Sequence, residues 1–197
     1  MEDNTNDLLK RLAEQSIGTC LAKLSGVSAG AWSLAAASVR KETLQAALKR
    51  HPFRSGEAAA VHFSVSGDYP FLSVMLFEPE ELECVSKCFL GYAFPGIPGI
   101  KLPEEVMLLE LGNIVLNSVI SAVSNGLKKL LMPAVPKFSQ GDALGLALEL
   151  GALPGQSPAY RVIELSLDIK GGESVSRSTV LCLLPEDLAA ELERRAL

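Results

Sequence analysis

The most informative stretch of this chain is residues 103–131, PEEVMLLELGNIVLNSVISAVSNGLKKLL. Its apolar residues recur at the spacing of one helix face: Leu109, Val115, Leu116, Val119, Ala122, Val123 and Leu127. This spacing predicts one long amphipathic helix. Pro103 suits the first turn of a helix, and the acidic pair 104–105 and the basic pair 128–129 match the charges at the two ends of the helix dipole.

The polar residues of this helix fall in one narrow stripe: Glu110, Asn113, Asn117, Ser121, Ser124 and Lys128. Asparagine is a poorer helix former than the Glu, Lys, Arg or Gln usual at exposed helix positions, by a few tenths of a kcal/mol. Two asparagines on the stripe therefore indicate a requirement for carboxamides. An ordinary solvated helix face fits the same pattern.

Composition limits the classes of protein to consider. The 197 residues are 48% hydrophobic, which suits one large domain. The net charge is −5 and Lys and Arg form no run, so we expect no nucleic-acid partner. The acidic, polar N-terminus is unlike a signal peptide, and the polar stripe interrupts the apolar stretch, so we expect a cytoplasmic protein without a membrane span.

The cysteines and histidines do not suggest a metal centre. Cys20, Cys84, Cys88 and Cys182 are scattered in apolar contexts, and only two histidines are present. A metal site requires more ligands close together. We therefore expect buried, reduced thiols.

The rest of the chain is predicted to alternate helices and strands. Helices are expected at 5–25, 41–50, 79–88, about 140–150 and 185–197, and strands at 31–39, 57–66, 71–77, 159–169 and 175–184. Residues 132–136 are expected to be a short extended piece. Residues 89–102, rich in Gly and Pro, are expected to be an apolar linker.

The element order repeats, which indicates an internal duplication. Residues 74–82 (VMLFEPEEL) align with residues 180–188 (VLCLLPEDL), and Leu12-Ala13-Glu14 falls where Leu111-Gly112-Asn113 falls. We expect one α/β domain over 1–197, built of two repeats at about 5–88 and 103–197 joined by the linker. The predicted fold is pseudo-twofold, with a sheet of about six strands and the two long helices side by side on one face.

Glu110-Leu111-Gly112-Asn113 has the form E-x-x-N on a helix, and 22 residues separate Asn113 from Pro136. Together with the repeated α/β unit, this pattern resembles the CheC/CheX/FliY family of chemotaxis phosphatases. The resemblance implies a CheC-like fold over nearly the whole chain. It also implies hydrolysis of the aspartyl phosphate of a CheY-like response regulator.

The resemblance assigns roles to residues of the second half. Asn113 would orient the attacking water, and Glu110 would pair with a receiver lysine; a carboxamide suits the first task because it donates and accepts hydrogen bonds without charge. Asn117 and Ser121 are expected to contact the partner, and Pro136 to be structural. The protein would need no cofactor of its own, because the receiver supplies Mg²⁺.

Two positions depart from the family pattern. Val106 stands where the family often has Asp or Ser, four residues before Glu110. In the first half, Arg11 and Glu14 stand where Glu and Asn would be needed, and a Glu would repel a phosphoryl group. We therefore expect one site, in the second half, and a degenerate one in the first.

Two alternatives to a phosphatase stay open from the sequence. One is a binding module of the CheC-like type, which docks a receiver or a CheD-like deamidase without hydrolysis. The other is a structural part of the flagellar switch, as for the FliY-type members. Those members usually carry a further C-terminal switch domain, which we do not expect here because the last predicted element is a helix. A homodimer is compatible with the phosphatase and with both alternatives.

Overall fold

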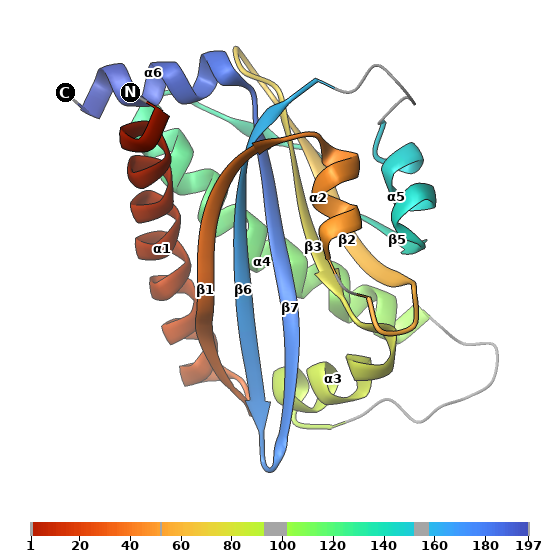
Figure 1. Cartoon of the computed structure of the whole chain (residues 1–197). Coiled ribbons are helices and arrows are strands. Elements are labelled where there is room, and N and C mark those ends of the chain that lie inside the picture. The colour runs from red at the N-terminus through yellow and green to blue at the C-terminus, as the bar shows by residue number, and fades with distance from the viewer. Residues whose placement is uncertain (1, 52, 93–101, 152–157, 197) are drawn as a thin grey trace.

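The computed structural model describes residues 2–51, 53–92, 102–151 and 158–196 (Figure 1). Its helices are α1 Glu2–Val27, α2 Leu44–Arg50, η1 Pro79–Glu81, α3 Leu82–Leu90, α4 Leu102–Leu127, α5 Ala143–Glu149 and α6 Glu186–Ala196. Its strands are β1 Ala31–Glu42, β2 Ala58–Ser66, β3 Phe71–Phe77, β4 Met132–Pro133, β5 Lys137–Gly141, β6 Tyr160–Gly171 and β7 Ser174–Leu184.

The strands form one seven-stranded antiparallel sheet in the order β1-β6-β7-β3-β2-β4, with β5 also paired to β2. The order has the symmetry expected of two interleaved halves, because the first strand of each half pairs with the second strand of the other and β7 and β3 meet at the centre. The α/β class is confirmed. The sheet has seven strands rather than about six because its edge strand is divided into β4 and β5. That the two repeats superpose stays a prediction.

Helices cover both faces of the sheet. One core joins the sheet to α1, α3, α4 and α6, and a smaller core on the other face joins it to α2 and α5. The two long helices are on the same face, as predicted, and Ser16 Oγ of α1 donates to the carbonyl of Ser118 of α4 at 2.5 Å. The two chain ends lie close together (Figure 1), where Thr5 Oγ1 donates to Glu193 Oε2 at 2.6 Å.

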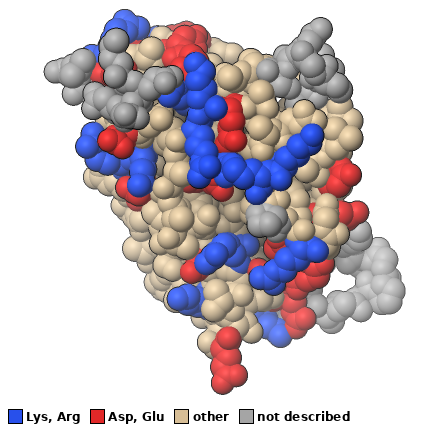
Figure 2. All heavy atoms as spheres, in the orientation of Figure 1, with Lys and Arg blue, Asp and Glu red and all other residues tan. Residues whose placement is uncertain are grey.

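The face seen in Figure 1 carries charges of both signs close together (Figure 2). Arg50 of α2 pairs with Glu42 of β1 and with Glu164 of β6, and Arg177 of β7 pairs with Asp168 of β6. These pairs join neighbouring elements. They leave a surface of mixed charge on this face.

Helix α4 is the one helix of the described residues that is long and apolar enough to cross a membrane. Half of the relevant window is buried within the protein. Leu111, Val115 and Leu116 are fully buried against the sheet. The apolar length of α4 is therefore accounted for by its packing on the core.

Gly112 sets how closely α4 approaches the sheet. A Cβ at this position would lie 2.4 Å from Cγ1 and 2.8 Å from Cβ of Val61 in β2. Both distances are shorter than van der Waals contact allows. Only glycine fits here without displacing the helix or the strand.

Several predicted boundaries were wrong: α1 spans Glu2–Val27 rather than 5–25, and β1 continues to Glu42 rather than ending at 39. Three further differences have a local cause. Helix α4 ends at Leu127 rather than 131, because Lys128 takes a left-handed conformation with φ of 53° and the Lys129 N–H turns back to the carbonyl of Ser124 at 3.2 Å. Residues 137–141 form strand β5, so the next helix starts only after Asp142, which caps it. Helix α2 likewise starts after its N-cap, Thr43. Most of the predicted linker, 93–101, lies outside the described residues.

A chain of three polar side chains, two of them buried, anchors the edge strand. His62 Nε2 of β2 lies 3.0 Å from Ser139 Oγ of β5, and that hydroxyl donates to Glu149 Oε1 of α5 at 2.6 Å. His62 and Ser139 are 8% and 5% exposed. Burial lowers the pKa of His62, partly offset by the charge of Glu149 and reinforced by Lys137. Burial also lowers the pKa of His51.

Replacing Gly112 by alanine should destabilise the fold by about 1–3 kcal/mol, as overpacking of a tight core does. The matched control is Gly18→Ala in α1, where an added Cβ meets nothing within 4 Å. There alanine should stabilise by about 0.5–1 kcal/mol through helix propensity. Urea unfolding measures both changes, and equal effects at the two sites would contradict the close approach.

Stability should fall as the pH is lowered through about 6.5, the usual pKa of histidine. The folded protein holds both histidines at a lowered pKa, so the unfolded chain binds more protons in this range. The substitutions His62→Gln and His51→Gln should each remove part of this slope. Denaturant unfolding from pH 7.5 to pH 6 checks the slope, and a slope unchanged in the double variant would refute its assignment to these groups.

Candidate functional site

The predicted polar stripe is on the uncovered side of α4. Glu110 and Ser121 are exposed, and Asn113 and Asn117 between them are partly buried. The 3.6-residue periodicity produces this line because the apolar positions between them point into the core. Val106, one turn before Glu110, extends the stripe and is 59% exposed. The residues predicted for the site in α4 therefore lie together.

The two asparagines are hydrogen-bonded to each other. Asn117 Nδ2 donates to Asn113 Oδ1 at 2.7 Å. Within the described part of the chain, the Asn113 amino group and the Glu110 carboxylate have no hydrogen bond or ion pair. A carboxylate and an amide donor are thus available to a partner on the same helix face.

Pro136 follows α4 in the chain, and the pairing of the edge strands with β2 brings it close to α4 again. Val65 and His62 of β2 pair with Pro133 and Lys137, so three edge residues, 134–136, face two on β2. Pro136 cannot donate to the ladder and lies in this break. Phe138, two residues later, pairs with Val61, the residue that Gly112 packs against. The 22-residue spacing thus brings Pro136 back towards the Gly112 turn of α4.

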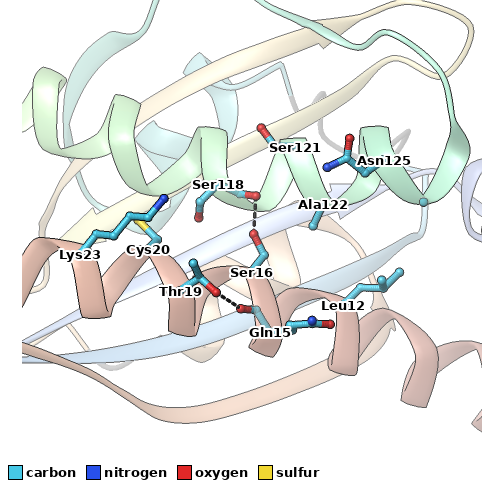
Figure 3. A pocket seen from close by; sticks show the side chains of 11 residues that line it. Leu12, Gln15, Ser16, Thr19, Cys20, Lys23, Ser118, Ser121, Ala122 and Asn125 are labelled. Atoms are coloured by element: carbon cyan, nitrogen blue, oxygen red, sulfur yellow. Dashed lines mark hydrogen bonds between the residues drawn. The ribbon is translucent and has the colours of Figure 1, made fainter.

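A hollow of about 670 Å³ lies between the two long helices and meets the stripe at Ser121 (Figure 3). Small and polar side chains dominate its lining: Gln15, Ser16, Thr19, Cys20, Lys23, Ser118, Ser121, Ala122 and Asn125, with Leu12 and Gly126. This hollow could not be predicted from the sequence, because it depends on how two helices distant in the chain pack together. Burial raises the pKa of the Cys20 thiol, which makes Cys20 a poor nucleophile.

The corresponding face of α1 has a different chemistry. Arg11 is exposed, and Glu14 is partly buried with its carboxylate 3.9 Å from Lys10 Nζ. Four residues after Glu14 the chain has Gly18, where the second half has Asn117. The first half therefore presents charged groups and no pair of carboxamides.

The other reactive side chains do not form a competing centre. In the His62–Ser139–Glu149 chain the serine is in the middle and donates to the carboxylate, so the histidine does not take its proton as in a nucleophilic triad. All four cysteines are free, and burial raises the pKa values of Cys88 and Cys182 to about 11. No group of three metal-ligating side chains occurs among the described residues.

No family model and no curated protein matches the sequence, but solved structures match its fold. FliY from Thermotoga maritima has a TM-score of 0.70 at 13% identity, covering 98% of this chain and 95% of that chain. A chain in the crystal structure of the FliG–FliM complex from H. pylori has a TM-score of 0.65 at 13% identity, covering 93% of this chain and 96% of that chain. A chain in the CheX–CheY–BeF3–Mg²⁺ complex from Borrelia burgdorferi has a TM-score of 0.52 at 10% identity, covering 89% of this chain and 97% of that chain.

At identities this low, the matches concern the fold alone. They cover at least 89% of this chain and at least 95% of the solved chain in each of these comparisons, and they also include a CheC-like protein from Shewanella and CheX from Desulfovibrio desulfuricans. The predicted CheC-like architecture is therefore confirmed. This chain has the fold of the CheC/CheX/FliY family.

Proposed function

We propose that this protein hydrolyses the aspartyl phosphate of a CheY-type receiver, and that it does so in the cytoplasm. The observation that carries the proposal is the pairing on α4 of an exposed carboxylate, Glu110, with a partly buried carboxamide, Asn113, whose amide is already held by Asn117. One solved protein with this fold forms a complex with CheY.

The reaction requires little covalent chemistry from this protein. A water oxygen forms a bond to phosphorus as the bond from phosphorus to the aspartyl oxygen breaks, and the electron pair of the broken bond goes to the carboxylate. Both hydrogens of the water finish on the phosphate product. Catalysis can then rest on positioning the water in line with the breaking bond.

Asn113 would supply that positioning. Its Oδ1 has a second lone pair, beyond the one used by Asn117, to accept a hydrogen bond from the water, and its Nδ2 can donate to the water or to a phosphoryl oxygen. The group is uncharged, so it does not repel the phosphate. Its place one turn from Glu110 allows both residues to enter the same pocket of a partner.

Glu110 would anchor the partner. As an exposed carboxylate without an ion pair in the described chain, it is free to pair with the lysine beside a receiver phosphorylation site. The Mg²⁺ would come from the receiver. Asn113 and Glu110 hold no metal in this proposal, and the receiver keeps its own acidic site.

The second candidate is docking without hydrolysis. It is favoured by Val106, an apolar and exposed side chain at the edge of the stripe, which suits a stable protein contact. The similarity to FliY and to the FliG–FliM complex, with TM-scores of 0.70 and 0.65, is also greater than the 0.52 of the CheX–CheY complex. A CheD-like partner and a homodimer stay predictions of the resemblance.

Asn113→Ala should slow the single-turnover decay of a phosphorylated receiver by about 100-fold, because water positioning is lost. Stability should change by less than about 1 kcal/mol, since the lost hydrogen bond is offset by the better helix propensity of alanine. The assay uses a receiver charged with acetyl phosphate and mixed with excess protein. Thermal melting is the folding control, and wild-type decay in a folded variant would favour the docking candidate.

The double variant Arg11→Ala, Glu14→Ala should retain nearly the full dephosphorylation rate, within about twofold. The first-half face has Glu14 and Gly18, and no carboxamide, at the positions that match Asn113 and Asn117. Surface charges of this kind contribute less than about 1 kcal/mol to stability. The same single-turnover assay measures the rate. A loss approaching that of Asn113→Ala would show that α1 carries a working site.

A further inference from the structure

We propose that Asn117 is a positioning residue, which fixes the side-chain amide of Asn113 in the one of its two orientations that serves hydrolysis. The inference rests on the proposed function and changes the expected role of Asn117, from contact with the partner to action through Asn113. The observation behind it is the 2.7 Å hydrogen bond from Asn117 Nδ2 to Asn113 Oδ1.

A lone asparagine on a helix surface is poorly oriented. The last torsion of its side chain is broad and nearly two-fold, so the oxygen and the amino group exchange places at little cost. The two ends of the amide have opposite chemistry, because one only accepts hydrogen bonds and the other only donates them. An Asn113 without a neighbour would present each end to the reacting centre part of the time.

The bond from Asn117 removes this ambiguity. It turns Asn113 Oδ1 towards Asn117 and so places Nδ2 on the other side of the same planar group. Oδ1 keeps one lone pair, and donation to Oδ1 polarises the amide and strengthens Nδ2–H as a donor. Both side chains are partly buried, which limits competition from water.

Helix geometry makes Asn117 suited to this role. Residues four apart lie over one another on a helix, so the donor comes from the next turn of the same rigid element. The bond therefore exists before any partner binds. The degenerate first half has Glu14 and Gly18 at the matching positions and cannot form it.

Four variants separate this role from the alternatives. Asn117→Leu keeps the shape and removes the donor. Asn117→Asp keeps the shape and offers only acceptors, so Asn113 would have to turn Nδ2 towards it. Asn113→Ala removes the group that is positioned, and it is combined with Asn117→Leu in a double variant. Asn125→Ala is the matched control, an exposed asparagine two turns further along α4.

The readouts are the saturated rate and the half-saturating concentration in single-turnover decay of a CheY-type receiver charged with acetyl phosphate. Asn117→Leu should lower the saturated rate about tenfold and leave the half-saturating concentration within about twofold. Asn117→Asp should lower the saturated rate at least as much. Adding Asn117→Leu to Asn113→Ala should cause no further loss, and Asn125→Ala should match wild type.

A second readout is independent of turnover. In ¹⁵N-labelled protein without a partner, the side-chain amide proton of Asn117 should be shifted downfield by its hydrogen bond. The signal should move to the position of a free amide in Asn113→Ala and stay in place in Asn125→Ala. A free-amide position in the wild type would overturn the positioning role before any assay.

The kinetic outcomes distinguish the two proposals. If the phosphorylated receiver decays as fast with the Asn113→Ala variant as with the wild type, the phosphatase proposal fails. The positioning role of Asn117 then fails with it. If Asn113→Ala is slow but the losses in the double variant multiply, the phosphatase proposal stands and the positioning role is wrong. A raised half-saturating concentration at an unchanged saturated rate in Asn117→Leu would likewise overturn it and make Asn117 a docking residue.

Discussion

The contact between Gly112 of α4 and Val61 of β2 determines where the candidate site lies. The space between helix backbone and strand side chain is too small for a Cβ, so α4 is held against the sheet at this turn. Glu110 and Asn113 flank Gly112 in sequence and are turned away from the contact. A helix held this closely at one turn has little freedom to rotate, and its outer face is presented in a fixed direction.

The surroundings of this contact support a rigid site. Val61 also pairs with Phe138 at the edge of the sheet, and the hydrogen-bonded chain from His62 to Ser139 and Glu149 holds the same edge from the opposite face. The two cores therefore meet at β2, one on each side. The catalytic proposal requires little movement of this protein, because the polar groups on α4 are already arranged and the partner brings the phosphate.

Features that depend on local periodicity were predictable from the sequence, and features that depend on distant contacts were not. The long helix, its stripe and the exposure of Glu110 follow from 3.6-residue spacing. The spacing of Asn113 and Asn117 allows a hydrogen bond between their side chains. It does not determine which of the two amides donates. Strand β5, residues KFSQG, has weak strand propensity and is extended because β2 pairs with it. The hollow between α1 and α4 could not be predicted from either helix alone, because residues of both helices line it.

The divided edge strand also bears on self-association. An open sheet edge can recruit another copy of the same chain when it is long, flat and regularly bonded. Here one edge is broken between β4 and β5 by an extra residue and a proline, and the other, β1, shifts register between Leu34 and Ala36. Such irregularities bend an edge and interrupt its row of donors. Both margins of the sheet thus resist continuous strand addition, which protects the protein from edge-to-edge aggregation.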